Sequence, residues 1–198
     1  MGYECLIAGL PELQEEGSAA PMTMEALDAL LAEMLADKDL EQLELLKRHV
    51  STGACRFVRD WQNYNRDLNN VLTAQICRKH NLDPRKAIIG DNELALQLKR
   101  PESQRLKDFG LAGTIDTLPE ILAVSEIENL MDREKHIDAL RFMWLEERTR
   151  SVFFSLENVL AYYLMNQMLC RWDVLTVEKG VKVFRDIVAE MKSGIHFD

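Results

Sequence analysis

The chain has 198 residues, 47% of them hydrophobic, which is enough to bury the core of one large domain or two small ones. Its 5 Pro and 9 Gly are few, so the composition favours long helices over many short strands, and we predict an all-α, multi-helix bundle. The formal net charge of -9 argues against nucleic acid as a partner, because binding to a phosphate backbone depends on an excess of Lys and Arg.

The apolar segments of the chain are too short for a membrane span. The N-terminal run, residues 3–10, follows no basic segment and is closed by Pro11, so we expect no signal peptide. The longest later run, residues 159–170, is interrupted by Asn166 and falls below the roughly 18 to 20 residues that a span requires. We therefore expect a soluble cytoplasmic protein with reduced cysteines, which reaches the inner face of a membrane only through a larger complex.

The N-terminal part of the sequence predicts one extended segment and two helices. Residues 3–10 are the segment whose short apolar run fits a strand or extended anchor, and residues 14–21 form an acidic linker after it. Thr23 can cap a helix that continues to Ala36, because its hydroxyl accepts a hydrogen bond from a first-turn amide. A second helix follows Asp37.

The middle of the sequence predicts a long amphipathic helix followed by short ones. Apolar and aromatic residues recur at helical spacing across residues 55–80, which we interpret as the first of two spine helices. Asp83 before Pro84 is typical of a capped helix start, Gly90 ends that short helix, and Asp91 opens another that stops before Pro101.

The C-terminal part predicts the second spine and two further helices. Thr117 with Glu120, and Ser125 with Glu128, both match the capping box, so a helix can start at either position. The second spine then covers residues 127–150, and the next helices cover residues 156–172, capped by Ser155, and residues 177–192, capped by Thr176 and ended by Gly194. We interpret residues 1–198 as a single helical domain, with two lobes, about 1–118 and 119–198, as the alternative.

No motif in the sequence predicts a catalytic, cofactor or metal site. Cys77 and His80 lie three apart, but His49 and Cys55 complete no spacing used by common zinc modules. The sequence also has no nucleophile elbow and no phosphate-binding loop. We therefore predict that the chain is not an enzyme and that it acts through contacts with other proteins.

A basic cluster at the end of the first spine is the local exception to the acidic charge. It consists of Arg78, Lys79, His80, Arg85 and Lys86. Cations are favoured near the C-terminus of a helix, and we prefer this explanation to a dedicated anion site.

Two segments near the ends of the chain resemble a known family. They are YECLIAGLPEL, residues 3–13, and a C-terminal set made of LAYYL at 160–164, Arg171 with Trp172, EKG at 178–180 and Phe184. In combination they are similar to an uncharacterised bacterial family encoded among the subunits of a V-type ATPase. That family resembles a reduced form of the C-type stalk subunit of V/A-type ATPases, the all-helical part that couples the central stalk to the rotor ring.

The resemblance implies a non-catalytic helical accessory or central-stalk-type subunit of a proton- or sodium-translocating V-type ATPase. Its implied partners are stalk or rotor-ring subunits, and it carries no catalytic residues and no cofactors. We expect the partner-binding residues to be Tyr162, Arg171 and Trp172, since exposed aromatic and Arg side chains dominate protein interfaces. The alternative function is a small-molecule-binding or enzymatic helical domain with a pocket between the two spine helices.

Overall fold

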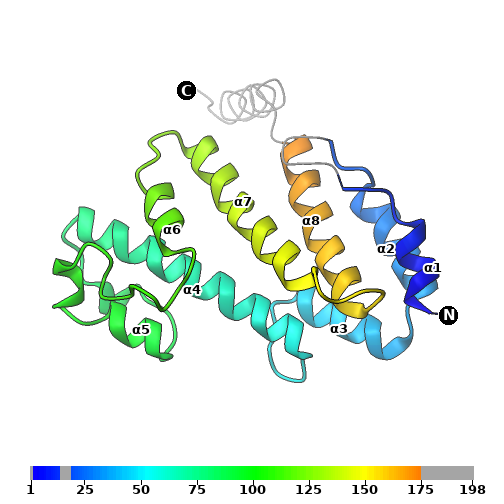
Figure 1. The fold of residues 1–198 in the computed structure, drawn as a ribbon, viewed down its shortest axis with the longest axis horizontal. Helices are drawn as coiled ribbons and strands as arrows, with labels where there is room; N and C mark the ends of the chain where they lie inside the picture. The colour runs from blue at the N-terminus through cyan, green and yellow to red at the C-terminus, as the bar shows by residue number, and fades with distance from the viewer. Residues whose placement is uncertain (1, 14–18, 175–198) are drawn as a thin grey trace, which may run out of the picture. The chain divides into compact units, whose positions relative to one another are not determined.

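The computed structural model describes residues 2–13 and 19–174. Within these residues the secondary structure consists of eight α-helices and two short 3-10 helices, with no strand (Figure 1). The fold class is all-α, as the composition predicts. The helix expected over residues 177–192 lies outside the described residues.

The chain divides into two compact units. Unit 1 combines Met1–Leu35 with Val152–Asp198, and unit 2 is the continuous segment Ala36–Ser151. A lobe boundary near residue 118, the alternative that the sequence suggests, would fall inside unit 2. A unit assembled from both ends of the chain depends on which distant segments pack together, and a linear pattern does not reveal this.

Unit 1 contains α1 (Tyr3–Gly9), α2 (Met24–Met34) and α8 (Leu156–Val174). Both α1 and α2 contact α8. Thr23 Oγ1 accepts a hydrogen bond from the Ala26 amide at 3.3 Å, and Ser155 Oγ accepts one from the Asn158 amide at 3.4 Å. Both predicted caps are therefore confirmed.

The predicted N-terminal strand is wrong, because residues 3–9 form the helix α1. Leu6 is buried, and Tyr3, Ile7 and Leu10 are half-buried, which is the spacing of one helix face. A run this short matches the strand and the helix pattern almost equally well. Contact with α8 favours the helix, which ends before Pro11, where a further amide donor is missing.

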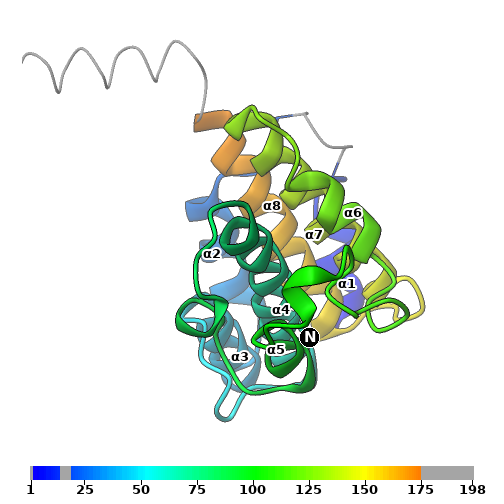
Figure 2. The ribbon, with the colours of Figure 1, turned by 90° about the vertical axis from the view of Figure 1, so that its left-hand side faces the viewer.

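Unit 2 begins with α3 (Asp37–Lys47) and the long helix α4 (Arg56–Lys79), and ends with α6 (Leu118–Val124) and α7 (Leu130–Thr149). Three short elements lie between α4 and α6, namely η1 (Pro84–Lys86), α5 (Glu93–Leu98) and η2 (Ser103–Arg105). Both α5 and α6 pack on α4 (Figures 1 and 2).

A hydrophobic core fills unit 2 around the C-terminal half of α4. Its buried members are Leu68, Val71, Ala74, Ile88, Leu94, Ala95, Leu98, Phe109, Leu111, Leu118, Ile121, Val124, Ile137 and Leu140. These residues come from α4, α5, α6, α7 and the segments between them. Burial of this many apolar side chains is the main force that stabilises unit 2.

Aromatic side chains join the two long helices of unit 2. The Trp144 ring of α7 stacks on Tyr64 of α4 at 5.1 Å and lies 5.6 Å from Trp61 and 6.1 Å from Phe57. The Tyr64 hydroxyl donates a hydrogen bond to the Leu140 carbonyl at 3.0 Å. The predicted spines, residues 55–80 and 127–150, therefore pack against each other through their aromatic residues.

Two predicted helix starts in unit 2 need correction. The α7 helix is capped by Asn129, whose Oδ1 accepts from the Met131 amide at 2.9 Å, whereas Ser125 Oγ donates to the Leu122 carbonyl at the end of α6. Likewise Asn92, and not Asp91, caps α5. Asn is as good a cap as Ser or Asp, so neighbouring residues compete for the position.

Candidate functional site

The two segments that carry the family resemblance meet in unit 1. The hydroxyl of Tyr162 on α8 donates a hydrogen bond of 2.9 Å to the carbonyl of Pro11, which follows α1. Tyr162 is half-buried, and burial raises the pKa of its hydroxyl. The polar end of this predicted contact residue is therefore bound inside the fold, and its ring is only partly accessible.

Three further side chains extend this contact along one face of α8. Asn166 Nδ2 and the Cys170 thiol both donate to the Met22 carbonyl, at 2.8 and 3.3 Å, and Asp173 accepts from the Ala20 amide at 2.8 Å.

Residues 162, 166, 170 and 173 are spaced by three or four, so they share one face of the helix. We call Tyr162, Asn166, Cys170 and Asp173 the α8 seam. It binds the backbone on both sides of residues 14–18.

Most of the α8 seam is not evident from the sequence. Asn166 is completely buried, although in the sequence it only interrupts an apolar run. The available signal is polar residues at helical spacing in an apolar helix, because a buried polar side chain requires a partner. The partners themselves are backbone groups, which carry no sequence signal.

Arg171 and Trp172 lie beside each other at the C-terminal end of α8. Arg171 is exposed and Trp172 is half-buried, and the Arg171 guanidinium carbon is 5.2 Å from the centroid of the Trp172 ring. A guanidinium over an indole ring forms a cation–π contact. The structure thus brings two of the three predicted partner-binding residues together, while Tyr162 lies several turns earlier in α8.

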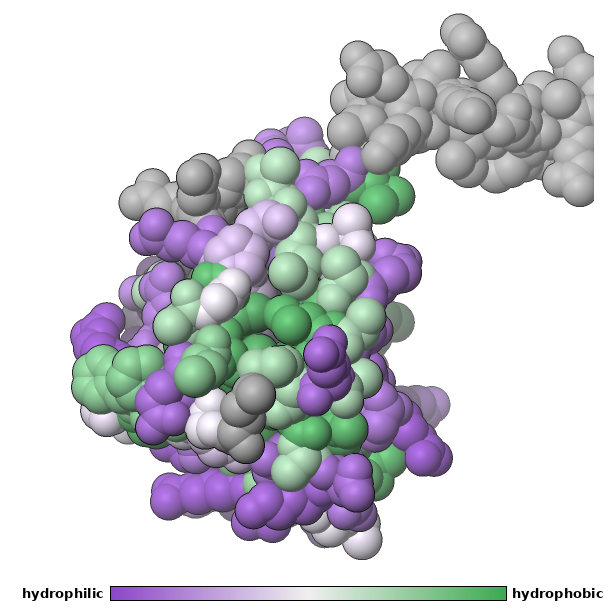
Figure 3. Space-filling model, turned by 90° about the vertical axis from the view of Figure 1, so that its right-hand side faces the viewer, coloured by the Kyte–Doolittle hydropathy of each residue, from purple (hydrophilic) through white to green (hydrophobic). Residues whose placement is uncertain are grey.

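Unit 1 also exposes apolar residues. Cys5 and Ala8 are exposed on α1, and Ala26, Ala29 and Ala32 are exposed on α2. Figure 3, which looks at the molecule from the side of α1, shows hydrophobic residues gathered into one area with hydrophilic residues around it. Phe153, before α8, is 76% exposed. Exposed apolar area of this kind is typical of surfaces that contact other proteins.

Unit 2 has a pocket beside the end of α4. Its volume is about 970 Å³, and it is lined by Gln75, Arg78, Lys107, Asp108, Ala112, Gly113, Ile115, Asp116, Leu118, Pro119, Leu122, Ala123 and Glu126. A smaller pocket of about 310 Å³ shares Gln75, Arg78 and Glu126 with it, and adds Ile76, Lys79, His80, Ser125 and Arg133. The smaller pocket lies between the end of α4 and the first turns of α7.

The predicted basic cluster separates into two parts. Arg85 forms an ion pair with Asp83 at 2.9 Å, and its hydrogen bonds lower the pKa of that carboxyl group. Arg78, Lys79 and His80 line the smaller pocket instead. Arg133 joins them there from a different helix, so the sequence pattern does not associate it with the cluster.

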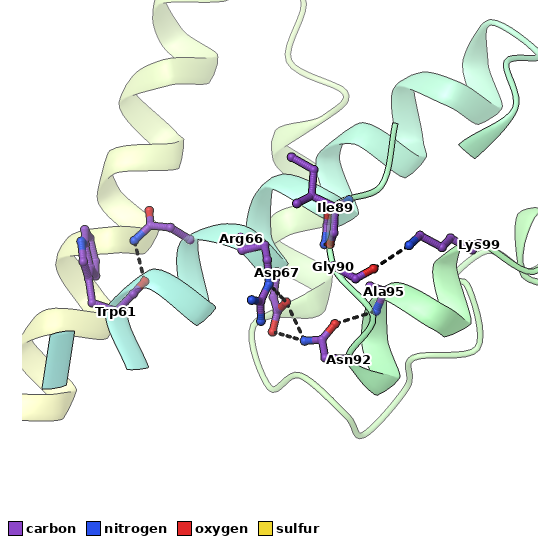
Figure 4. Close-up of polar contacts among 10 residues, drawn as sticks. Trp61, Arg66, Asp67, Ile89, Gly90, Asn92, Ala95 and Lys99 are labelled. Atoms are coloured by element: carbon purple, nitrogen blue, oxygen red, sulfur yellow. Dashed lines mark hydrogen bonds and ion pairs between the residues drawn. The ribbon is translucent and has the colours of Figure 1, made fainter. Parts of the chain in front are cut away.

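A polar network holds the segment after η1 against α4 (Figure 4). Asn70 Nδ2 donates to the Ile89 carbonyl at 2.8 Å, and the Ile89 amide donates to Asn70 Oδ1 at 3.0 Å. Asn92 Nδ2 donates to Asp67 at 3.0 Å, while Asn92 Oδ1 accepts from the first turn of α5. The amide groups of Asn70 and Asn92 therefore both have partners, in the backbone and in Asp67, so the network is structural.

The part of the chain that the structure describes has no cluster of three or more His, Cys, Asp or Glu residues suited to a metal ion. Cys77 is buried and His80 is exposed, so the two lie in different surroundings. In the same described residues, no helix combines the length and hydropathy needed to cross a membrane.

Comparisons with known proteins identify a family. The chain has no match among curated proteins and none among solved structures. A family model described as "Protein of unknown function (DUF2764)" matches residues 48–195, well over half of the chain. The match includes most of unit 2 and the whole of α8, but not α1 or α2. The chain therefore belongs to the DUF2764 family of proteins of unknown function.

Proposed function

We propose that the protein is a non-catalytic accessory or central-stalk-type subunit of a V-type, proton- or sodium-translocating ATPase. It acts by contact with stalk or rotor-ring subunits at the cytoplasmic face of the membrane. The proposal starts from the resemblance of residues 3–13 and of the C-terminal motifs to the family encoded with such ATPases.

The observation that carries the proposal is that the two segments with the family resemblance contact each other in one unit. Residues 3–13 and the LAYYL motif of α8 are far apart in sequence, yet α1 contacts α8 and Tyr162 binds the Pro11 carbonyl at 2.9 Å. Motifs that pack together can form one contact surface, whereas separate motifs would imply two independent roles. The remaining motif residues, 178–180 and Phe184, lie outside the described residues.

The surface of unit 1 has the chemistry that a contact function requires. Arg171 and Trp172 present a cation and an aromatic ring at the end of α8, and apolar residues of α1 and α2 are exposed on the same unit. Interface centres are enriched in aromatic and Arg side chains. Arg171 can in addition form charge-assisted hydrogen bonds with an acidic partner residue.

The test is affinity purification of the tagged chain from its native cell in mild detergent, with mass spectrometry of the retained proteins. The proposal predicts recovery of ATPase stalk and rotor subunits in a fixed ratio. Arg171→Glu should reduce their recovery, whereas Arg100→Glu, at an exposed position of unit 2, should not. Recovery of the chain without any ATPase subunit would contradict the proposal.

A second candidate function is binding of a small molecule by unit 2. It is supported by the pocket of about 970 Å³, a volume within the range of small-molecule sites, which is roughly 300–1,000 Å³. The pocket combines apolar side chains with a few charged groups, which is the usual composition of such sites.

A further inference from the structure

The two pockets of unit 2 are neighbours on one face of α4 and α6. Both are lined by Gln75, Arg78 and Glu126, so the two pockets lie next to each other at these side chains. We call the combined space the α4–α6 groove. Its larger chamber measures about 970 Å³ and its smaller chamber about 310 Å³.

The larger chamber has an apolar wall made by α6 and the segment before it. The wall residues are Ala112, Ile115, Leu118, Pro119, Leu122 and Ala123. Leu118 belongs to the core of unit 2, and Ile115 and Leu122 pack against that core. The wall is therefore held in place by the core and does not depend on a ligand for its shape.

The smaller chamber is cationic. Arg78, Lys79 and Arg133 line it together with His80, while Glu126 is its single carboxylate. In a chain with a net charge of -9, this concentration of positive charge is unusual. The acidic residues of the groove otherwise lie in the larger chamber, where Asp108 and Asp116 accompany Lys107.

The two arginines of the smaller chamber are oriented by neutral acceptors. Arg78 donates to the Leu106 carbonyl at 2.8 Å and to the amide oxygen of Gln75, and Arg133 donates twice to the Ile127 carbonyl, at 2.8 and 3.0 Å. Among the residues that the structure describes, no carboxylate lies within ion-pair distance of either guanidinium. Their positive charge is thus available to an anion, and their side chains are already positioned to receive it.

We propose that the α4–α6 groove binds a small amphipathic anion, in which an unbranched apolar chain carries one carboxylate or phosphate head group. The head group contacts Arg78, Lys79 and Arg133, and the apolar chain lies along α6. The proposal rests on the small-molecule function of unit 2 and not on a role in an ATPase, whose contact surface is assigned to unit 1. Neither a purely apolar ligand nor an inorganic anion would use both chambers.

Calorimetric titration of the purified full chain tests the proposal. The probes are dodecanoate and dodecyl phosphate, each below its critical micelle concentration. Dodecanol, which has the apolar chain without a charged head group, and inorganic phosphate, which has the charge without the chain, are the control compounds. We expect one molecule of dodecanoate or dodecyl phosphate to bind per chain, and each control compound to bind at least about tenfold more weakly. The relative affinities of the carboxylate and the phosphate identify the preferred head group. Equal binding of dodecanol, or no binding of either anion, would overturn the assignment.

Two variants and two controls localise the site. Ala123→Trp places a large side chain in the larger chamber, and Lys79→Glu reverses a charge in the smaller one; both residues are exposed, so the fold should tolerate the changes. We expect Ala123→Trp to abolish binding of dodecanoate and Lys79→Glu to weaken it about tenfold. Ala87→Trp and Lys86→Glu make the same changes at exposed positions outside the groove and should leave the affinity unchanged.

If the controls weaken binding as much as the groove variants do, the ligand binds elsewhere and the proposal fails. Far-ultraviolet circular dichroism of all four variants establishes that each is folded. Should Ala123→Trp unfold, Ala123→Leu adds less volume at the same place and is expected to weaken binding without abolishing it. Because the titration uses the isolated chain, its failure would leave the proposed ATPase contact untouched, and the reverse also holds.

Discussion

Each of the two units uses a buried asparagine on a long helix to hold a segment that is distant in sequence, but the two asparagines are satisfied differently. In unit 2, Asn70 both donates to and accepts from the backbone of Ile89. In unit 1, Asn166 donates to Met22, whereas its Oδ1 atom is buried with no hydrogen-bond partner in the described residues. A side-chain amide that both donates and accepts contributes two hydrogen bonds to the folded state. A buried acceptor without a partner lowers the free energy of unfolding.

The two asparagines also differ in the contacts around them. The Asn70 side chain is buried, and its amide group forms both of these hydrogen bonds with one residue, Ile89, as expected of a structural contact. The α8 seam of unit 1 instead combines a thiol, a hydroxyl, a carboxylate and an incompletely satisfied amide along the helix that also carries Arg171 and Trp172. Among the described residues, unit 2 also has buried polar atoms without a hydrogen-bond partner, at Gln62, Arg66, Gln104 and Arg148, so incomplete satisfaction is common to both units.

The largest expected effect compares two phenylalanines with the same unusual backbone. Phe109 in unit 2 and Phe154 in unit 1 have φ angles of 57° and 50°, but Phe109 is fully buried and Phe154 is 50% exposed. Phe109→Ala removes a core side chain that also packs against Arg78, so we expect a loss of about 4 kcal/mol in the free energy of unfolding. Phe154→Ala should cost about 0.5 kcal/mol.

Urea denaturation measures both phenylalanine variants. Alanine keeps the left-handed strain at either position, so the difference between the variants isolates burial. Similar losses for the two would show that burial does not distinguish these positions in the folded protein.

The next effect compares the two asparagines directly. Asn70→Ala leaves both the amide and the carbonyl of Ile89 without their partners, and we expect a loss of about 2 kcal/mol. Asn166→Ala also removes an orphaned acceptor, and the Cys170 thiol still donates to the Met22 carbonyl, so we expect a loss of about 1 kcal/mol. The midpoints of urea denaturation measure both losses, provided that the dependence of the free energy of unfolding on urea concentration has the same slope in each variant. A larger loss for Asn166→Ala would reverse the comparison between the units.

A smaller effect is expected at the contact between the two segments that carry the family resemblance. Tyr162→Phe keeps the ring and removes the hydrogen bond to the Pro11 carbonyl, which should cost about 1 kcal/mol or less because both groups are only half-buried. Hydrogen exchange of the α1 amides is the sharper readout, since loss of this bond should increase exchange in α1 while leaving α4 unchanged. Unchanged exchange in α1 would indicate that the bond does not fix that helix.

The last effect is a pH dependence at alkaline pH and concerns Tyr64 in unit 2. Burial raises the pKa of its hydroxyl to about 12 from the ordinary value of 10, although the nearby Arg141 lowers it. The folded state therefore holds the proton more tightly than the unfolded state. Its contribution to stability is complete below pH 10 and is lost as the pH rises towards 12.

Denaturation at several alkaline pH values, with and without Tyr64→Phe, tests this pH dependence. The variant should flatten the decline in the free energy of unfolding between pH 10 and 12. At neutral pH it should cost about 1 kcal/mol or less, because it removes the hydrogen bond to the Leu140 carbonyl. An identical decline in both proteins would show that a group other than the Tyr64 hydroxyl causes the pH dependence.

Local patterns in the sequence are sufficient to predict the positions of most helices. The spine predicted over residues 55–80 is α4, Arg56–Lys79, because its long apolar stripe has a clear helical period. Thr23 and Ser155 are predictable as caps because their chemistry acts within the first turn of the same helix. The strand prediction for the short segment 3–10 is wrong, since a few residues do not distinguish the two periods.

The candidate sites can be predicted only in part from the sequence. Arg171 and Trp172 are neighbours in the chain and remain so at the end of α8, and the basic residues Arg78 and Lys79 stand out in an acidic sequence. Their combination with Arg133, and the contacts of Asn166 and Cys170 with the Met22 carbonyl, join positions far apart in the chain. Partners of this kind leave no periodic signal.

The sequence by itself determined the all-α class and the position of the long helices, because helix periodicity and capping act over a few neighbouring residues. Only the tertiary structure decided that both ends of the chain form unit 1, that the α8 seam binds the backbone around residues 14–18, and that three cations of two helices line one chamber. The physical reason is that packing selects among distant segments by the area they bury and the polar groups they satisfy, and both depend on three-dimensional contact.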